Sequence, residues 1–337
     1  MKKKHPLLTG ALILTLTGVA TRLMGFFYKI FLSRTIGAEG MGIYQMIFPI
    51  FGICFSLTAA GIETSISRFV AGETARGNVK GARKMLAAGL GLSLFLSLLA
   101  AFALYAGADF LAIYYLKEPR CAVLLRFLSL TLPFSACHAC ISGYYYGMKQ
   151  TSVPAISQLL EQTVRVGGVY LLASICTEKG IAVSPVIAVL GLAMGEFIST
   201  LFCITAFSSH VSNSAASALS DKLGNPVFRA SAIQSFSTCL KQILTMSLPL
   251  TGNRVVTNLL SSLEAILIPL SLKSYGLSPE AAYSVYGTLT GMSLSFILFP
   301  NVLTGSISVL LLPSVSEAQA SGNQERVADT IRKAVAF

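Results

Sequence analysis

The chain has 337 residues, of which 54% are hydrophobic and only 12% are charged, and its mean hydropathy is +0.71. A soluble domain carries about 25% charged residues, so this composition excludes an ordinary soluble protein and indicates an integral membrane protein. The net charge of +11 then has to be explained by membrane topology before nucleic-acid binding is considered.

Apolar stretches long enough to cross a bilayer recur along the whole sequence. Crossing the hydrocarbon layer takes about 20 apolar residues in a helix. Eight stretches meet this requirement, and we predict spans at residues 7–32, 43–69, 85–107, 121–146, 153–176, 185–207, 243–272 and 285–312. The first is too long for a cleavable signal peptide, whose apolar region has about 7–15 residues. The sequence thus predicts an all-α polytopic membrane protein.

Lysine and arginine residues are unequally divided between the two sides. With the N-terminus in the cytoplasm, fourteen lie in inner segments and five in outer loops. Cytoplasmic loops are enriched in these residues, so we predict a multi-pass protein of a cytoplasmic membrane with a cytoplasmic N-terminus. Topology accounts for most of the positive charge, and no nucleic-acid partner is expected.

The first predicted span carries two cations at membrane depth. Its small and cationic residues recur at helical spacing and form one stripe, made of Gly18, Arg22, Gly25 and Lys29. A guanidinium at bilayer depth costs at least about 2.5 kcal/mol on insertion scales, so it has to face a partner or a wet cavity. The stripe predicts either an internal polar cavity or an arginine that locks helix packing through a carboxylate or helix carbonyls.

Acidic residues occur inside several later spans. The fifth span has a polar stripe in helical register, formed by Gln158, Glu161, Gln162 and Arg165. Glu161 precedes Arg165 by four residues, which is the spacing of a helical ion pair. This pair is either structural or part of a site. Because carboxylates are costly in a membrane, the further candidates for ion coupling or for cavity charge partners are Glu63, Glu196 and Glu264. Gly191 and Gly195 predict close helix packing beside Glu196.

The cysteines and histidines predict no metal or redox site. Cys137 and Cys140 flank His138 with CxxC spacing, but the motif has no second ligand pair and lies inside a span. We interpret it as a structural feature in which the thiols act as small apolar side chains. His5 and His210 suggest no site either, and no cofactor or catalytic motif is expected.

A polar stretch from Ser208 to Gln242 separates the sixth and seventh spans. Its composition predicts a cytoplasmic connector, and a helical stripe near its end predicts an interfacial helix that leads into the seventh span. We therefore predict an N-terminal six-helix bundle at residues 1–207, a connector at 208–242 and the start of a second bundle at 243–337.

Short motifs recur in the same order in the two predicted bundles. Leu-Thr-Gly and then an arginine, Arg22 or Arg254, occur in the first and seventh spans. Ser-Ile-Ser ends both the second and the eighth span, and Ala-x-Gly-Asn follows at residues 75–78 and 320–323. Four such matches favour a parallel internal repeat with both copies in the same orientation. The second copy holds two spans and the beginning of a third at residues 334–337, so we expect the second bundle to be incomplete.

Four longer motifs lie in and beside these repeats: TRLMGF at residues 21–26, GAEGMGIY at 37–44, SLPL at 247–250 and LLPSVSEA at 311–318. They resemble motifs of the stage V sporulation protein B family. This family comprises oligosaccharide flippases of the polysaccharide biosynthesis group, in a superfamily with the lipid II flippase and the multidrug and toxin extrusion transporters. The resemblance implies a two-bundle flippase or extrusion-transporter fold in a bacterial cytoplasmic membrane, with a central cavity that opens alternately to each side.

The resemblance also implies that Arg22 and Arg254 are the cavity arginines of the two halves. Lys29 and Asn258 lie on the same stripes and are further candidates for substrate binding. A guanidinium binds a pyrophosphate bidentately, so the implied substrate is a lipid-linked oligosaccharide or peptidoglycan precursor, with spore cortex formation as one context. No Walker A loop is present. An ion gradient, the membrane potential or substrate flux would supply the energy, and a coupling cation is a candidate partner beside membrane lipids.

Two other functions stay open. An ion-coupled multidrug or cation antiporter would need a cavity dominated by carboxylates, for which Glu63, Glu161, Glu196 and Glu264 are available, although arginines compete with them. A polytopic membrane glycosyltransferase would need acidic or histidine motifs beside an outer loop, whereas the predicted outer loops are short and hold single carboxylates. Binding of a lipid-linked oligosaccharide or of an organic cation would discriminate between flippase and antiporter.

Overall fold

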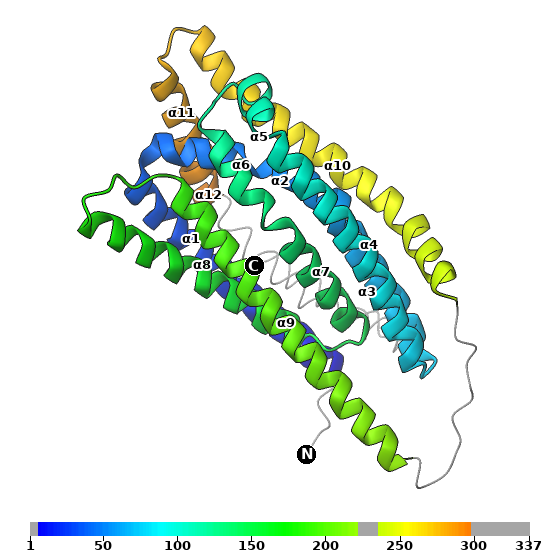
Figure 1. Cartoon of the computed structure of the whole chain (residues 1–337). Coiled ribbons are helices and arrows are strands. Elements are labelled where there is room, and N and C mark those ends of the chain that lie inside the picture. The colour runs from blue at the N-terminus through cyan, green and yellow to red at the C-terminus, as the bar shows by residue number, and fades with distance from the viewer. Residues whose placement is uncertain (1–5, 222–234, 298–337) are drawn as a thin grey trace, which may run out of the picture.

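The computed structural model describes residues 6–221 and 235–297, which form a bundle of long helices (Figure 1). The helices are α1 (Pro6–Met46), α2 (Phe48–Phe55), α3 (Gly61–Ala75), α4 (Val79–Ala106), α5 (Ala108–Phe110), α6 (Cys121–Ser129), α7 (Leu132–Gly147), α8 (Ser152–Glu178), α9 (Val186–Asp221), α10 (Phe236–Ser274), α11 (Pro279–Gly287) and α12 (Leu294–Ile297). Three π-helical segments continue them, namely η1 (Ser56–Ala60), η2 (Leu111–Tyr115) and η3 (Thr288–Ser293). No strand occurs in these two ranges.

The helices follow the predicted spans in order. Five spans fall within single helices, to within one residue (α1, α4, α8, α9 and α10), and the spans at 43–69 and 121–146 are assembled from shorter pieces. The eighth predicted span, 285–312, lies only partly within the described residues. By length and hydropathy alone, four stretches qualify as membrane spans, or five if α6 and α7, bent by 45°, count as one. The first of these stretches, Ile13–Ala75, contains two predicted spans, whereas α8 does not qualify. The polar stripe of α8 therefore sets it apart from its neighbours.

Proline residues explain where two of the spans are broken. Pro49 lies in the first turn of α2 and Pro133 in the first turn of α7. A proline lacks the backbone N–H, so it is tolerated in the first turn of a helix and disrupts a helix interior. Pro49 therefore marks the start of a new helix within the second predicted span.

The connector predicted from Ser208 is partly helical. Helix α9 continues to Asp221, and α10 begins at Phe236 and runs without interruption into the seventh span. Residues 222–234 lie outside the described part of the chain, as do the motifs at residues 306–323 and the expected start of a ninth span. The division into two bundles stays a prediction.

Helix α10 packs directly on the first predicted bundle. Its buried residues Ile243 and Cys239 join an apolar core with residues of α3, α4 and α7, while Ala265 joins a second core with residues of α1, α6 and α9. In Figure 1, α10 lies along α4 for most of its length. Helix α10 is therefore anchored by apolar burial to helices that precede it in the chain.

Helices α1 and α11 approach each other at one end of the bundle. A Cβ atom on Gly42 would collide with the backbone carbonyl oxygen of Tyr283 in α11. Buried residues around this contact include Met41 and Tyr286. Only a residue without a side chain allows the two backbones to come this close.

Charged residues reinforce the same end. Arg120 donates from Nε to Glu118 Oε1 at 2.7 Å and from Nη1 to Glu39 Oε1 at 2.6 Å. Burial would raise the pKa of the Glu118 carboxyl, but hydrogen bonds from Arg120 outweigh it and hold that pKa below its ordinary value. Lys273 of α10 donates to the hydroxyl of Tyr283 at 2.6 Å. Polar contacts thus tie the end of α1 to a loop, and the end of α10 to α11.

The close approach of α1 and α11 predicts the effect of a single methyl group. We expect Gly42→Ala to lower the free energy of unfolding by about 1–3 kcal/mol, because the two backbones have to separate. Gly18→Ala is the matched control on α1, since a Cβ there meets nothing within 4 Å, and it should be neutral or slightly stabilising. Thermal unfolding of both variants in detergent measures the difference. Equal stability of Gly42→Ala and the unmodified chain would contradict the packing.

Candidate functional site

Four ionisable side chains from three helices meet inside the bundle, and we call His138, Glu161, Arg165 and Glu196 the charge cluster. Arg165 forms an ion pair with Glu161 on α8, and His138 Nδ1 of α7 lies 3.5 Å from Glu196 Oε2 of α9. Their side chains are only 12–19% exposed. Charges buried to this extent are stable only when they balance one another.

Local sequence explains why the charge cluster forms between α8 and α9. A Cβ on Gly195 would lie 2.7 Å from the backbone carbonyl oxygen of Glu161. The missing side chain lets α9 approach α8 closely, which brings the adjacent Glu196 beside Glu161. The close packing predicted from Gly195 is confirmed.

Two buried serines complete the surroundings of His138. Its Nε2 lies 3.0 Å from Ser157 Oγ of α8, and its Nδ1 lies 3.4 Å from Ser199 Oγ of α9. One ligand atom each from His138, Glu161 and Glu196 lie within 4.8 Å of one another. This geometry allows the three side chains to share one small cation or proton.

Helices α1 and α3 enclose the charge cluster further. Tyr28 and Tyr44 of α1 interact electrostatically with Arg165. Glu63 of α3 interacts electrostatically with both His138 and Arg254. Glu63 therefore interacts both with a member of the charge cluster and with a predicted cavity arginine of α10.

The predicted cavity arginines are placed differently from Arg165. Arg22 on α1 and Arg254 on α10 are both exposed. The arginines that form ion pairs within the described ranges are Arg76, Arg120, Arg126 and Arg165, so neither predicted cavity arginine is held in this way. Glu264 is likewise exposed on α10.

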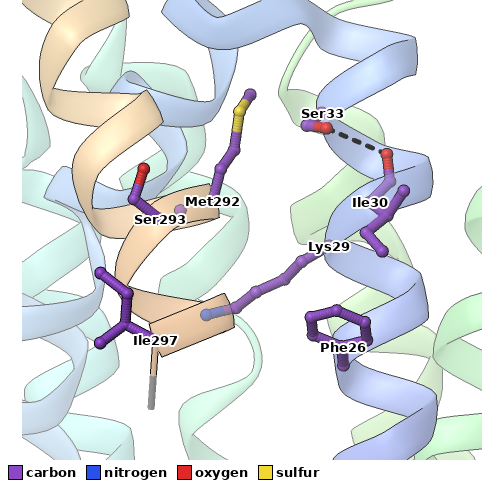
Figure 2. A pocket seen from close by; sticks show the side chains of 8 residues that line it. Phe26, Lys29, Ile30, Ser33, Met292, Ser293 and Ile297 are labelled. Atoms are coloured by element: carbon purple, nitrogen blue, oxygen red, sulfur yellow. Dashed lines mark hydrogen bonds between the residues drawn. The ribbon is translucent and has the colours of Figure 1, made fainter. Parts of the chain in front are cut away.

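Lys29 lines a pocket between α1 and the segment formed by η3 and α12. The pocket has a volume of about 440 Å³ and is lined by Phe26, Lys29, Ile30, Ser33, Gly291, Met292, Ser293 and Ile297. Figure 2 shows the side chain of Lys29 extending from α1 across this space toward the helix that carries Ile297. The ammonium group is thus presented to a largely apolar pocket.

Asn258 makes a contact between helices. Its Nδ2 donates to Ser56 Oγ of η1 at 3.0 Å and to the backbone carbonyl of Arg254 at 3.0 Å. The amide oxygen lies close to the Cα of Gly52 in α2. The observed contacts of Asn258 therefore join α10 to the second span.

Comparison with known proteins assigns the chain to a family. The family described as "Polysaccharide biosynthesis protein" matches residues 7–316. The chain belongs to this family. Stage V sporulation protein B of Bacillus subtilis (strain 168) is 31% identical over 314 residues, which make up 93% of this chain and 59% of that relative. Lipid II flippase MurJ of the same organism is 28% identical over 176 residues, which make up 50% of this chain and 32% of that relative.

Solved structures share the fold of this family member. A MOP superfamily transporter from Pyrococcus furiosus Vc1 (DSM3638) has a TM-score of 0.60 at 16% identity, covering 99% of this chain and 69% of that chain. A multidrug resistance MATE family transporter of the MOP superfamily, in an inward-facing conformation, has a TM-score of 0.59 at 14% identity. The match covers 97% of this chain and 70% of that chain. The fold class predicted from the sequence is confirmed, and the chain is a multi-pass membrane protein.

The sequence around His138 does not single it out. The CxxC motif predicts a purely structural feature, and the structure does leave Cys137 and Cys140 as buried free thiols. The histidine between them, however, contacts Glu196, which lies far along the chain. No local pattern signals this contact, because it depends on which helix packs beside α7.

The contacts of Asn258 predict a loss of stability on truncation. We expect Asn258→Ala to lower the free energy of unfolding by about 0.6–2 kcal/mol, because a hydrogen bond between two membrane helices is lost. Thr257→Ala is the control, since Thr257 is exposed and its hydroxyl donates within α10 to the carbonyl of Asn253. Thermal unfolding measures both. A stable Asn258→Ala variant with weakened ligand binding would instead support the substrate-binding role predicted from the sequence.

Proposed function

We propose that this family member is a flippase that moves a lipid-linked oligosaccharide or peptidoglycan precursor across the bacterial cytoplasmic membrane by alternating access. The observation that carries the proposal is the pair of exposed guanidinium groups, Arg22 on α1 and Arg254 on α10. Neither forms an ion pair within residues 6–221 and 235–297, although Glu63 interacts electrostatically with Arg254. An exposed arginine in a membrane helix has to face water, a partner or an anion. The proposal concerns the whole transporter, because the chain spans 59% of the length of stage V sporulation protein B.

The chemistry of arginine favours a phosphate-bearing headgroup. A planar guanidinium donates two parallel hydrogen bonds to a phosphate, and it remains charged at all relevant pH values. A cationic cavity would lower the cost of moving a pyrophosphate through the membrane while the lipid tail stays in the bilayer. Lys29 and Asn258 are further substrate contacts in this proposal.

The names of the relatives support the same class of substrate. One relative is a sporulation protein and another is a lipid II flippase, so spore cortex formation is a reasonable setting for this chain. The positive-inside rule supports a cytoplasmic N-terminus, with the arginine-bearing ends of α3 and α4 facing the cytoplasm. We propose transport and no catalytic step.

An ion-coupled multidrug or cation antiporter is the second candidate function. It is favoured by two carboxylates at membrane depth, Glu161 and Glu196. Glu161 is already paired with Arg165, however, and both carboxylates are mostly buried. The exposed charges Arg22 and Arg254 would repel an organic cation, so we prefer the flippase.

Substitution of the two arginines tests the proposed substrate class. In the native full-length protein, we expect Arg22→Ala and Arg254→Ala each to weaken binding of a pyrophosphate-linked lipid at least tenfold, because truncating one partner of a buried charged contact costs about 2–5 kcal/mol. Arg22→Lys keeps the positive charge but loses the planar guanidinium that donates two parallel hydrogen bonds. Its affinity for the lipid should lie between those of Arg22→Ala and the unmodified protein. Fluorescence titration with the lipid gives the affinity.

A control separates binding from folding. Arg126→Gln removes an arginine that is paired with Asp109 and 41% exposed, and it should leave lipid binding unchanged. Melting temperatures of all variants identify any that are misfolded. Well-folded Arg22→Ala and Arg254→Ala variants with unchanged lipid affinity would contradict the proposed function.

A further inference from the structure

The hydrogen bonds of two serines determine what His138 can do. Ser157 Oγ donates to the backbone carbonyl of Pro154 at 2.9 Å, and Ser199 Oγ donates to the backbone carbonyl of Glu196 at 3.1 Å. A hydroxyl has a single proton. When each serine proton is used in its carbonyl bond, the serine oxygens present lone pairs to the imidazole, one to Nε2 and the other to Nδ1.

Glu196 adds a stronger acceptor at the same place. Its Oε2 lies 3.5 Å from His138 Nδ1, and this buried oxygen has no hydrogen bond within the described residues. Each ring nitrogen of His138 thus faces an acceptor. A neutral imidazole has one N–H and would leave one nitrogen lone pair against an oxygen lone pair, whereas an imidazolium donates on both sides.

The balance of charges leads to the same state. Glu161 and Glu196 contribute two negative charges, and Arg165 contributes one positive charge. With a neutral His138 the charge cluster carries an excess negative charge at membrane depth, which is costly. One proton on His138 brings the sum to zero.

We propose that the charge cluster is a binding site for one exchangeable proton, held by His138 and stabilised by Glu196, while Arg165 neutralises Glu161. The inference rests on the proposed function, because it assigns the coupling cation of the transporter. Loss of the proton would leave Glu196 and Glu161 facing a single cation. The helices α7, α8 and α9 would then admit water or separate.

Groups on neighbouring helices also act on His138. Glu63 of α3 interacts with it electrostatically, as do Glu161 of α8 and Cys203 of α9. Arg165 is the nearby cation, and it is paired with Glu161. The carboxylates therefore outnumber the fixed cation around the imidazole.

A divalent metal ion fits the same residues poorly. Only three ligand atoms converge, and Glu161 is already engaged by Arg165. A metal would have to displace the guanidinium and leave it buried without a partner, which is strongly unfavourable. A proton requires no such displacement.

Nitrogen NMR of the histidine side chains tests the proton site directly. The chain has three histidines. In the ¹⁵N-histidine-labelled chain in lipid nanodiscs, the signals that disappear in His138→Gln are those of His138. We expect both ring nitrogens of His138 to be protonated at about pH 7, whereas a histidine in water is mostly neutral at that pH. In Glu196→Gln, one nitrogen should lose its proton at that pH.

Two controls and the contrary results complete the test. Ser199→Ala removes an acceptor without changing the charge, and Glu178→Gln removes a charge at the end of α8, so both should leave His138 doubly protonated.

A neutral His138 in the unmodified chain from about pH 5 to 8 would overturn the proposal, and so would a doubly protonated His138 in well-folded Glu196→Gln. If His138 is neutral and the melting temperature of the protein rises with added Na⁺, the site binds a sodium ion and the proton proposal is wrong. No lipid substrate is needed, so these results are independent of the lipid-binding test.

Discussion

The ion pair between Arg165 and Glu161 is the interaction on which the first half of the structure depends. A guanidinium with 19% exposure in a membrane helix would be very costly alone, and its partner lies one helical turn earlier on the same helix. Because the pair makes one face of α8 polar, that face has to turn inward, where α7 and α9 supply His138 and Glu196. The close approach at Gly195 then follows from the need to exclude lipid from these charges.

Arginines at membrane depth fall into two groups in this protein. Arg165 is paired and mostly buried, so it acts within the bundle, whereas Arg22 and Arg254 are exposed and lie outside the observed ion pairs. The proposed flippase uses the second group for an anionic headgroup and the charge cluster for a proton. Glu63 interacts with both Arg254 and His138. It provides a physical link through which the state of one site could influence the other.

Much of the fold and part of the site could be predicted from the sequence. Hydropathy located the helices, and helical spacing predicted the pairing of Glu161 with Arg165, because both are local properties. The role of His138 could not be predicted, since its contact with Glu196 joins two helices whose packing no sequence spacing encodes. The contacts of Asn258 were missed for the same reason. They depend on α10 lying against η1, whereas the sequence indicated only a polar stripe.

A double-mutant cycle on Glu161 and Arg165 tests most directly whether buried charge balance organises the bundle. Glu161→Gln and Arg165→Gln should each lower the free energy of unfolding by about 3–5 kcal/mol, because each leaves an unpaired buried charge. The loss of unfolding free energy in the double variant should be much smaller than the sum of the two single losses. The difference is the coupling energy of the pair, which we expect to reach at least about 0.5–3 kcal/mol. Strictly additive losses would contradict the account, since they would show that the two charges are stabilised independently.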